Sequence, residues 1–314
     1  MGPRRESLWR KSRLSHDHSQ AMPLRYPFSA GEAAAHTRLP AGACDCHIHV
    51  YNQGVPAVPG ARLTPPDASL QDYQQIQSRM GTCRAVVVTP STYGTNNRLL
   101  LDALETLGED GRGVAVIRGN EPDEALASMH AKGVRGVRVN LSQSTVHDNR
   151  AIEHLAHRIA PLGWHLQVLM PVSTLLELEP MLRKLPVDLV FDHFARISPV
   201  QFNPNPGHAL VLDLLRQRRA WVKLSGGYLV SPTASTEDPA LDALACSYIS
   251  AAPDRVIWGS DWPHATASAG QQPMPDDARQ IDCLARWAGD PARLQQILVT
   301  NPERLYSFNP KVQP

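Results

Sequence analysis

Two histidines and an aspartate alternate with other residues near residue 45. They belong to the run Asp45-Cys46-His47-Ile48-His49. In an extended strand, a period of two sends Asp45, His47 and His49 to one face, and Cys46 and Ile48 to the other. Burying two imidazoles and a carboxylate together is costly unless they bind a metal ion, a substrate or each other. The pattern therefore indicates a reactive or ligand-binding site, although an exposed edge strand with incidental histidines would show the same spacing.

Two more polar residues interrupt apolar runs later in the chain. His193 follows the run that begins at residue 187, and Asp261 ends the run that begins at residue 255. Taken alone, His193 reads as a core or loop histidine, and Asp261 as a helix cap or turn former. The two residues gain meaning only if the fold brings them to the same place as His47 and His49.

Short apolar runs alternate with segments of helical period from about residue 43 onward, which is typical of βαβ units and a parallel sheet. From Asp45 to Asp261 there are 216 residues in seven steps of about 31, the length that one βαβ unit requires. An open nucleotide-binding sheet is disfavoured, because no Gly-rich phosphate loop follows the first strand. The expected strands are 43–51, 84–90, 113–118, 134–141, 164–170, 187–194, 220–225 and 255–261, and the expected helices are 70–80, 97–107, 123–132, 149–160, 174–185, 208–218, 241–251 and 276–288.

Eight strands at seven equal intervals predict an α/β fold with a single (β/α)8 TIM barrel over residues 41–314, including a short C-terminal helical extension. Such barrels carry their catalytic groups at the carboxyl ends of the strands. His47, His49, His193 and Asp261 are thus expected around one mouth of the barrel. His165, near the start of its strand, is expected to lie away from that mouth, packed between strand and helix.

Composition narrows the class of partner. The 314 residues carry 31 Lys+Arg against 30 Asp+Glu, a net charge of +1, which disfavours a nucleic-acid or anionic-membrane partner and favours a small molecule.

Residues 1–40 hold seven basic and three acidic side chains, so we expect a basic, partly disordered N-terminal extension there. Five cysteines without a Cys-x-x-Cys pair, together with the lack of a signal or membrane-spanning run, favour a reducing, cytoplasmic location. Oligomeric state is not indicated.

The chain resembles the amidohydrolase superfamily, and within it the branch of 2-pyrone-4,6-dicarboxylate lactonases, 4-sulfomuconolactone hydrolases and D-galactarolactone isomerases. The resemblance covers nearly everything from residue 42 to residue 308. It rests on the segments 45–49, 133–140, 163–165, 192–193, 256–264 and 299–306. The superfamily fold is a (β/α)8 barrel, in agreement with the spacing.

The resemblance implies roles for the residues at the mouth. It implies that Asp261 is the general base that takes a proton from water, and that His47, His49 and His193 polarise the scissile carbonyl. Many relatives also hold zinc through a Lys or His on the fifth strand, but here that strand carries Gln167. A binuclear metal site is therefore not expected, and the branch resembles enzymes that need no metal. A single Zn²⁺ or other divalent metal ion on His47, His49 and Asp261 stays open.

Other strand ends are expected to select the substrate. Arg138 shares its parity with Gly136 and Asn140 and is the inward candidate on its strand. Its planar guanidinium suits a carboxylate. The resemblance supports Arg138 and Arg196 as substrate-binding residues, and it matches Ser91 after the second strand and Tyr228 after the seventh. The loop that carries Ser91 also contains Tyr93. Loop packing is the ordinary alternative for each of these loop residues.

The dicarboxylate lactonases carry further arginines after the fourth and seventh strands, where this sequence has none, so a monoanionic, hydroxyl-rich lactone is expected. The sequence thus predicts a hydrolase that opens a carboxylated lactone of the sugar-acid or muconate type. The alternatives are a lactone isomerase on the same scaffold, a 2-pyrone-4,6-dicarboxylate lactonase, a zinc-dependent decarboxylase and a non-catalytic binding protein.

Overall fold

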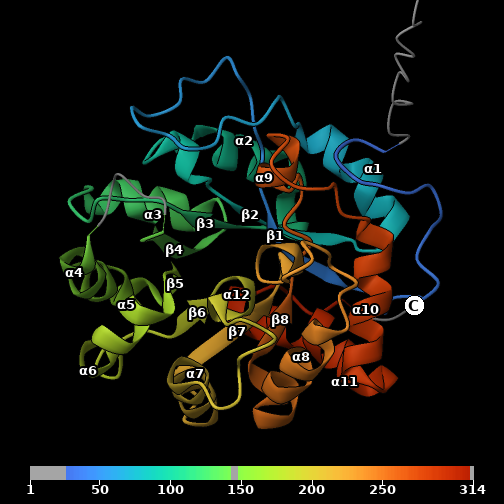
Figure 1. Cartoon of the computed structure of the whole chain (residues 1–314). Helices are drawn as coiled ribbons and strands as arrows, with labels where there is room; N and C mark the ends of the chain where they lie inside the picture. Colours follow the sequence, from blue (N-terminus) through green and yellow to red (C-terminus); the bar gives the residue numbers. More distant parts are fainter. Residues whose placement is uncertain (1–25, 143–147, 312–314) are drawn as a thin grey trace, which may run out of the picture.

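The strands form one parallel barrel surrounded by helices (Figure 1). The computed structural model describes residues 26–142 and 148–311. Within these residues, eight strands pair in sequence order, which confirms the predicted (β/α)8 TIM barrel. The strands are β1 (Cys44–Ile48), β2 (Arg84–Val88), β3 (Gly111–Ala115), β4 (Val134–Asn140), β5 (His165–Leu169), β6 (Leu189–Phe191), β7 (Ala220–Leu224) and β8 (Val256–Trp258).

Helices follow the strands as the sequence pattern predicts. The first is capped at Ser69, whose side chain accepts from the Asp72 amide, and it ends at Gly81 in the left-handed conformation. The predicted helix 174–185 is instead two short helices, because Pro180 has no amide hydrogen to continue the first. The helices are α1 (Leu70–Met80), α2 (Arg98–Leu107), α3 (Asp123–Ala131), α4 (Asn149–Ile159), α5 (Val172–Glu177), α6 (Glu179–Leu182), α7 (Pro206–Arg216), α8 (Ala240–Ala251), α9 (Ala265–Ser268), α10 (Asp277–Ala288), α11 (Pro291–Gln295) and α12 (Asn301–Tyr306).

The barrel closes between β8 and β1, just beyond the last residue of β8. The Asp261 amide donates to the His47 carbonyl over 2.9 Å, and the His49 amide donates to the Trp262 carbonyl over 2.8 Å. Gly259 permits this approach, because a Cβ there would lie 2.6 Å from the His47 Cβ. The same hydrogen bonds that close the barrel therefore bring Asp261 beside the two histidines of β1.

At the amino-terminal ends of the strands, which we call the lower end of the barrel, the inward side chains form an apolar cluster. This cluster is distinct from the larger core between strands and helices. Tyr306, the last residue of α12, and Phe308 close this cluster from below. The ring of Phe308 lies under the guanidinium groups of Arg84 and Arg112, at 5.1 and 4.5 Å. The inner cluster consists of Cys44, Cys46, Val86, Val88, Val114, Val190, Trp221, Ile257, Tyr306 and Phe308. The lower end of the barrel is thereby filled.

Part of the predicted N-terminal extension is packed on the barrel. Arg79 of α1 donates to the Ala33 carbonyl over 2.8 Å and to the Ser29 hydroxyl over 3.0 Å. Residues 1–25, on which the prediction of a partly disordered leader mainly rests, lie outside the described residues, and the boundary at residue 40 stays a prediction. Among the helices of the described residues, none has the length and apolar character needed to cross a membrane.

Candidate active site

A bulge in β1 decides which of its side chains reach the site. Asp45 pairs with Ala85 and Ile48 pairs with Val87, so β1 takes three residues where β2 takes two. Cys46 therefore faces the inner cluster below, and His47 faces inward directly after it. The predicted strict alternation is right for His47, Ile48 and His49, but wrong for Asp45 and Cys46.

Asp45 points instead toward the helix layer, where it ties three elements together. Its carboxylate accepts hydrogen bonds from the Tyr73 hydroxyl at 3.1 Å, from the Ser260 amide at 2.9 Å and from the His47 amide at 3.1 Å. Burial raises the pKa of Asp45 to about 6, against the opposing effect of the Ser260 and His47 donors. Asp45 thus fixes the bulge but does not reach the reacting centre.

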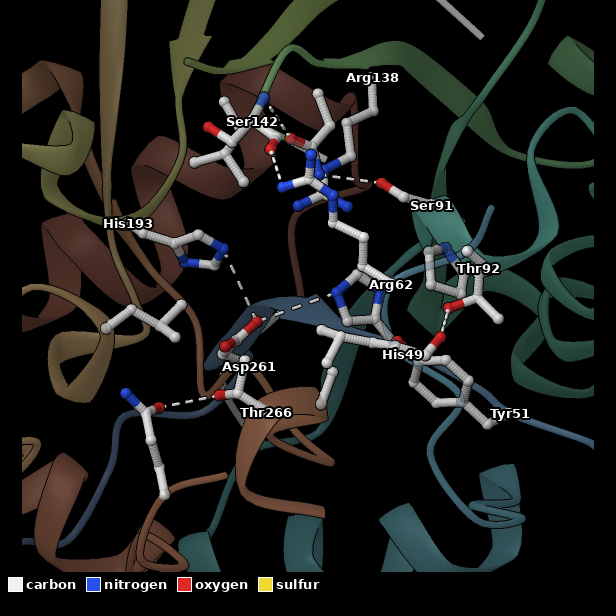
Figure 2. Close-up of a pocket in the computed structure, with 18 of the residues that line it drawn as sticks. His49, Tyr51, Arg62, Ser91, Thr92, Arg138, Ser142, His193, Asp261 and Thr266 are labelled. Carbon is white, nitrogen blue, oxygen red and sulfur yellow. Dashed lines mark hydrogen bonds and ion pairs between the residues drawn. The ribbon is translucent and has the colours of Figure 1, made fainter. Parts of the chain in front are cut away.

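Three imidazoles surround one carboxylate oxygen of Asp261 at the mouth, and Figure 2 shows two of them, His49 and His193, beside Asp261. The Oδ1 atom of Asp261 lies 3.6 Å from His47 Nε2, 3.8 Å from His193 Nε2 and 3.9 Å from His49 Nε2. The structure therefore brings together the four residues that the sequence singled out, from β1 and from the ends of β6 and β8. His49, His193 and Asp261 line the cavity, while His47 is fully buried beneath them.

A left-handed turn presents His193 and Arg196 to the same cavity. All four residues from 193 to 196 have positive φ, between 50° and 58°, although none is glycine. Such a conformation costs roughly 1–2 kcal/mol per residue, so it persists only where surrounding contacts hold it. Here the Ser225 hydroxyl lies 2.9 Å from His193 Nδ1, and Arg196 donates to the Leu229 carbonyl over 3.1 Å. These contacts hold His193 and Arg196 in the turn that presents them to the cavity.

The environment of Asp261 suits a base. Its second oxygen, Oδ2, accepts a hydrogen bond from the Tyr228 hydroxyl at 2.7 Å, which leaves Oδ1 facing the imidazoles and the cavity. Burial acts to raise the pKa of Asp261, but the His193, His47 and His49 rings outweigh it and lower the pKa below its ordinary value. Burial likewise lowers the pKa of His49 to about 4 and lowers the pKa of His193. An ionised carboxylate beside neutral imidazoles results.

A buried charged network supports His47 from below. Asp192 accepts from Arg138 Nε and from Gln167 Nε2, both at 3.1 Å, and its Oδ1 lies 3.3 Å from His47 Nδ1. Lys223 Nζ lies 2.9 Å from Gln167 Oε1, 3.2 Å from His47 Nδ1 and 3.6 Å from Asp192 Oδ1. The sequence reasoning missed this network. The available signal was a lysine within the apolar run of β7, on the inward parity of Trp221, because a fully buried lysine needs partners.

The cavity above these groups has a volume of about 260 Å³ and carries several cations. Arg138, Arg196 and Tyr228 line it, as does Ser91, whose hydroxyl accepts a hydrogen bond from Asn140 Nδ2 at 2.9 Å. Arg62, in the loop between β1 and α1, also lines the cavity and donates to the Ser142 carbonyl over 3.4 Å (Figure 2). Arg62 was missed because a loop arginine carries no strand parity.

Tyr93 takes the ordinary alternative of loop packing. Its hydroxyl accepts from the Asn52 amide at 2.8 Å and donates to the Asn52 carbonyl at 3.0 Å. Tyr93 is absent from the lining formed by the described residues. His165 lies away from the mouth, as predicted, but inside the barrel and not between strand and helix: its ring lies 5.2 Å from that of Tyr306, and a Cβ on Gly136 would come 2.4 Å from its Nε2.

The spacing of the donor atoms, taken alone, fits a metal ion. His47 Nε2 and His49 Nε2 are 3.3 Å apart, close to the separation of about 3.3 Å that ligands on a tetrahedral Zn²⁺ require. His47, His49 and Asp261 form one group close enough to hold an ion, and His47, Asp192 and His193 form another. Lys223 Nζ lies 3.2 Å from His47 Nδ1, and an ammonium that donates to Nδ1 does not fit ligation, because it leaves the other ring nitrogen of a neutral imidazole to carry the proton.

Comparison with known proteins agrees with this geometry. Residues 44–308 match the model of the amidohydrolase family. The chain is 34% identical over 281 residues to a 2-pyrone-4,6-dicarboxylate hydrolase of Comamonas testosteroni, covering 86% of this chain and 91% of the relative. It is 29% identical over 289 residues to a D-galactarolactone isomerase of Agrobacterium fabrum, covering 88% and 95% of the two chains.

A solved structure shows the same architecture. The crystal structure from Acinetobacter baumannii, assigned as a 2-pyrone-4,6-dicarboxylic acid hydrolase and holding citric acid, superposes with a TM-score of 0.74 at 26% identity. The match covers 85% of this chain and 100% of that one. The chain therefore belongs to the amidohydrolase family, as a lactonase-type enzyme whose relatives are lactone hydrolases and isomerases.

Proposed function

We propose that this enzyme hydrolyses a carboxylated lactone, with Asp261 as the general base. The observation that carries the proposal is the asymmetry of the Asp261 carboxylate. Oδ2 is held by the Tyr228 hydroxyl at 2.7 Å, while Oδ1 faces the cavity within 4 Å of three imidazoles. An ionised acceptor next to hydrogen-bond donors is the arrangement that ester hydrolysis by water requires.

The reaction follows from these positions. A water molecule on Asp261 Oδ1 gives up a proton to the carboxylate as its oxygen attacks the lactone carbonyl. Negative charge then develops on the carbonyl oxygen, where imidazole N–H groups act as donors. When the ring C–O bond breaks, the alkoxide takes the proton from Asp261, which leaves a ring-opened hydroxy acid and the free base. The imidazoles keep their protons throughout.

Charge at the cavity supports an anionic substrate. Four cationic side chains, Arg62, Arg138, Arg196 and Lys223, lie at or below the cavity against two carboxylates, Asp192 and Asp261, a balance of 4 − 2 = +2. Arg138 uses only Nε for Asp192, so its terminal nitrogens are available to a carboxylate. We assign Arg138 and Arg196 to the substrate carboxylate, and Ser91 and Tyr228 to its polar oxygens. Arg62 adds a place for a second acid group, which widens the expected class from monoanionic to dianionic lactones.

We further propose that the reaction needs no metal ion, that the substrate is a free small molecule, and that neither nucleic acid nor a membrane takes part. All five cysteines are unpaired, which supports a reducing, cytoplasmic compartment.

Isomerisation is the second candidate. The similarity to a galactarolactone isomerase and the hydroxyl of Tyr228 on Asp261 both favour it. In that reaction a hydroxyl of the substrate replaces water as the nucleophile, so no acid is released. A 2-pyrone-4,6-dicarboxylate lactonase remains a third candidate, through the Comamonas relative.

A pH-stat assay on a panel of mono- and dicarboxylated lactones tests the proposal. Hydrolysis consumes one base equivalent per turnover, and isomerisation consumes none. Asp261→Asn removes the proton acceptor, so kcat on the best substrate should fall by about 10³-fold, or about 4 kcal/mol in activation free energy. Asp213→Asn, the same chemical change on the outer helix α7, is the matched control and should leave kcat within about twofold. Full turnover by Asp261→Asn would contradict the assignment of the base.

A further inference from the structure

A chain of three contacts runs through the two histidines of β1. Lys223 Nζ lies 3.2 Å from His47 Nδ1, His47 Nε2 lies 3.3 Å from His49 Nε2, and His49 Nδ1 lies 2.7 Å from the Val88 carbonyl oxygen. A neutral imidazole has one N–H donor and one lone pair, on different nitrogens. The nitrogen that carries the proton in one contact therefore determines which atom must donate in the next contact.

The two ends of the chain set its direction. A backbone carbonyl only accepts, so His49 carries its proton on Nδ1 and has a lone pair on Nε2. A lysine ammonium only donates, so His47 has its lone pair on Nδ1 and its proton on Nε2. The middle contact then joins a His47 N–H to a His49 lone pair, and all three contacts become hydrogen bonds without conflict.

Asp192 is the competing partner of His47. Its Oδ1 lies 3.3 Å from His47 Nδ1, but that oxygen has no partner with hydrogen-bond geometry among the described side chains. A carboxylate that accepts from Nδ1 would leave Nε2 free, which is the arrangement that supports histidine ligands of metal ions. Lys223 decides between a His47 proton on Nε2 and one on Nδ1, because its ammonium donates to His47 Nδ1 and also lies 3.6 Å from Asp192 Oδ1.

We propose that Lys223 is a positioning residue that keeps the His47 proton on Nε2, and that it thereby makes this cluster a hydrogen-bond donor site rather than a metal site. The three histidines then differ in role. The His47 N–H lies between the His49 lone pair, 3.3 Å away, and Asp261 Oδ1, 3.6 Å away, whereas His49 has no N–H at the reacting centre. His49 therefore orients the His47 ring and does not polarise the lactone carbonyl. This last role rests on the proposed lactone hydrolysis, but the proton position does not.

The test uses the full-length, metal-free protein with ¹⁵N-labelled histidine. Long-range ¹H–¹⁵N spectra of the imidazoles report which nitrogen carries the proton. We expect Nε2–H for His47 in the wild type, and a shift to Nδ1–H in Lys223→Met, where Asp192 becomes the acceptor. Gln167→Met is the matched control, because it removes the other hydrogen-bond partner of Lys223 and leaves the contact with His47; His47 should stay Nε2–H in that variant.

A zinc titration of the same proteins, by calorimetry with a competing chelator, gives a second readout. Lys223→Met should bind Zn²⁺ at least ~10-fold more tightly than the wild type, a gain that a damaged fold would not produce. Gln167→Met should stay within about threefold of the wild type. His47 protonated on Nδ1 in the wild type, or an unchanged zinc affinity in Lys223→Met, would overturn the proposal. If Lys223→Met does not fold, the wild-type spectrum decides. Neither measurement needs a substrate, so failure here is distinct from failure of the proposed function.

Discussion

The upper and lower ends of the barrel interior are built on the same strands but from opposite chemistry. On β6 and β7, the lower inward positions are Val190 and Trp221, in the apolar cluster closed by Phe308. Two residues further along each strand stand Asp192 and Lys223, which are fully buried and 3.6 Å apart. On each strand the side chain thus changes from apolar to charged between one inward-facing position and the next.

This difference separates the stabilising part of the barrel from the reactive part. Apolar side chains in the lower layer gain free energy on burial without further requirements. Charged side chains in the upper layer lose their hydration on burial, and only contacts with each other offset the free energy that this costs. They therefore do not by themselves stabilise the fold. The upper layer is thus explained by the positioning of Arg138 at the cavity and of His47 directly beneath it. Substitutions in the two layers should have separable effects.

The largest expected effect is on the upper layer. Asp192→Asn leaves Arg138 and Lys223 without a buried counter-charge, so the free energy of unfolding should fall by about 3–5 kcal/mol. Urea denaturation measures this change, and kcat of the remaining folded enzyme should fall as well. Asp213→Asn on α7 serves as the control, with a change within about 0.5 kcal/mol. Equal stability of the two variants would mean that Arg138 and Lys223 do not depend on Asp192 as their counter-charge.

A substitution in the lower layer should affect stability without activity. Phe308→Ala opens a cavity in the inner cluster, and it should lower the free energy of unfolding by about 3 kcal/mol. Because Phe308 closes the lower end of the barrel, away from the charged layer, kcat/KM per folded molecule should stay within about twofold of the wild type. Denaturation and initial rates on the same preparation check both halves. A large loss of kcat/KM would show that the two layers are not separable.

The smallest expected effect concerns pH. The pKa of Asp261 is lowered and that of His49 is about 4, so the base is ionised and the imidazole neutral across roughly pH 5–8. As pH falls, activity is lost only when these groups gain protons, so kcat/KM should be flat over that range and decline near pH 4. Circular dichroism at each pH separates this decline from unfolding. An acid limb with a midpoint near 6.5, the ordinary value for histidine, would contradict the electrostatic assignment.

Much of this arrangement follows from the sequence. The regular spacing of apolar runs predicted eight strands, and the polar ends of three of them predicted His47, His49, His193 and Asp261 around one mouth. The parity of Arg138 on β4 also predicted its inward direction. These predictions succeed because burial in a parallel barrel imposes a strong pattern on every strand.

The rest could not be predicted because it depends on contacts between distant segments. The bulge in β1 adds one residue to one strand and changes no residue type, so Asp45 and Cys46 were assigned to the wrong faces. Arg62 reaches the cavity from a loop, where no period applies. Lys223 was visible in its strand, but its partners Asp192 and His47 come from two other strands, and only the closed barrel shows them together.

The most direct test of the central claim is the path of the water oxygen. In H₂¹⁸O, a single turnover on the best lactone substrate should place one ¹⁸O atom in the new carboxylate, as measured by mass spectrometry. This result is expected if water activated by Asp261 attacks the carbonyl. Product without ¹⁸O would contradict the account: an isomeric lactone would point to attack by a substrate hydroxyl, and an unlabelled ring-opened acid would point to attack by the Asp261 carboxylate itself.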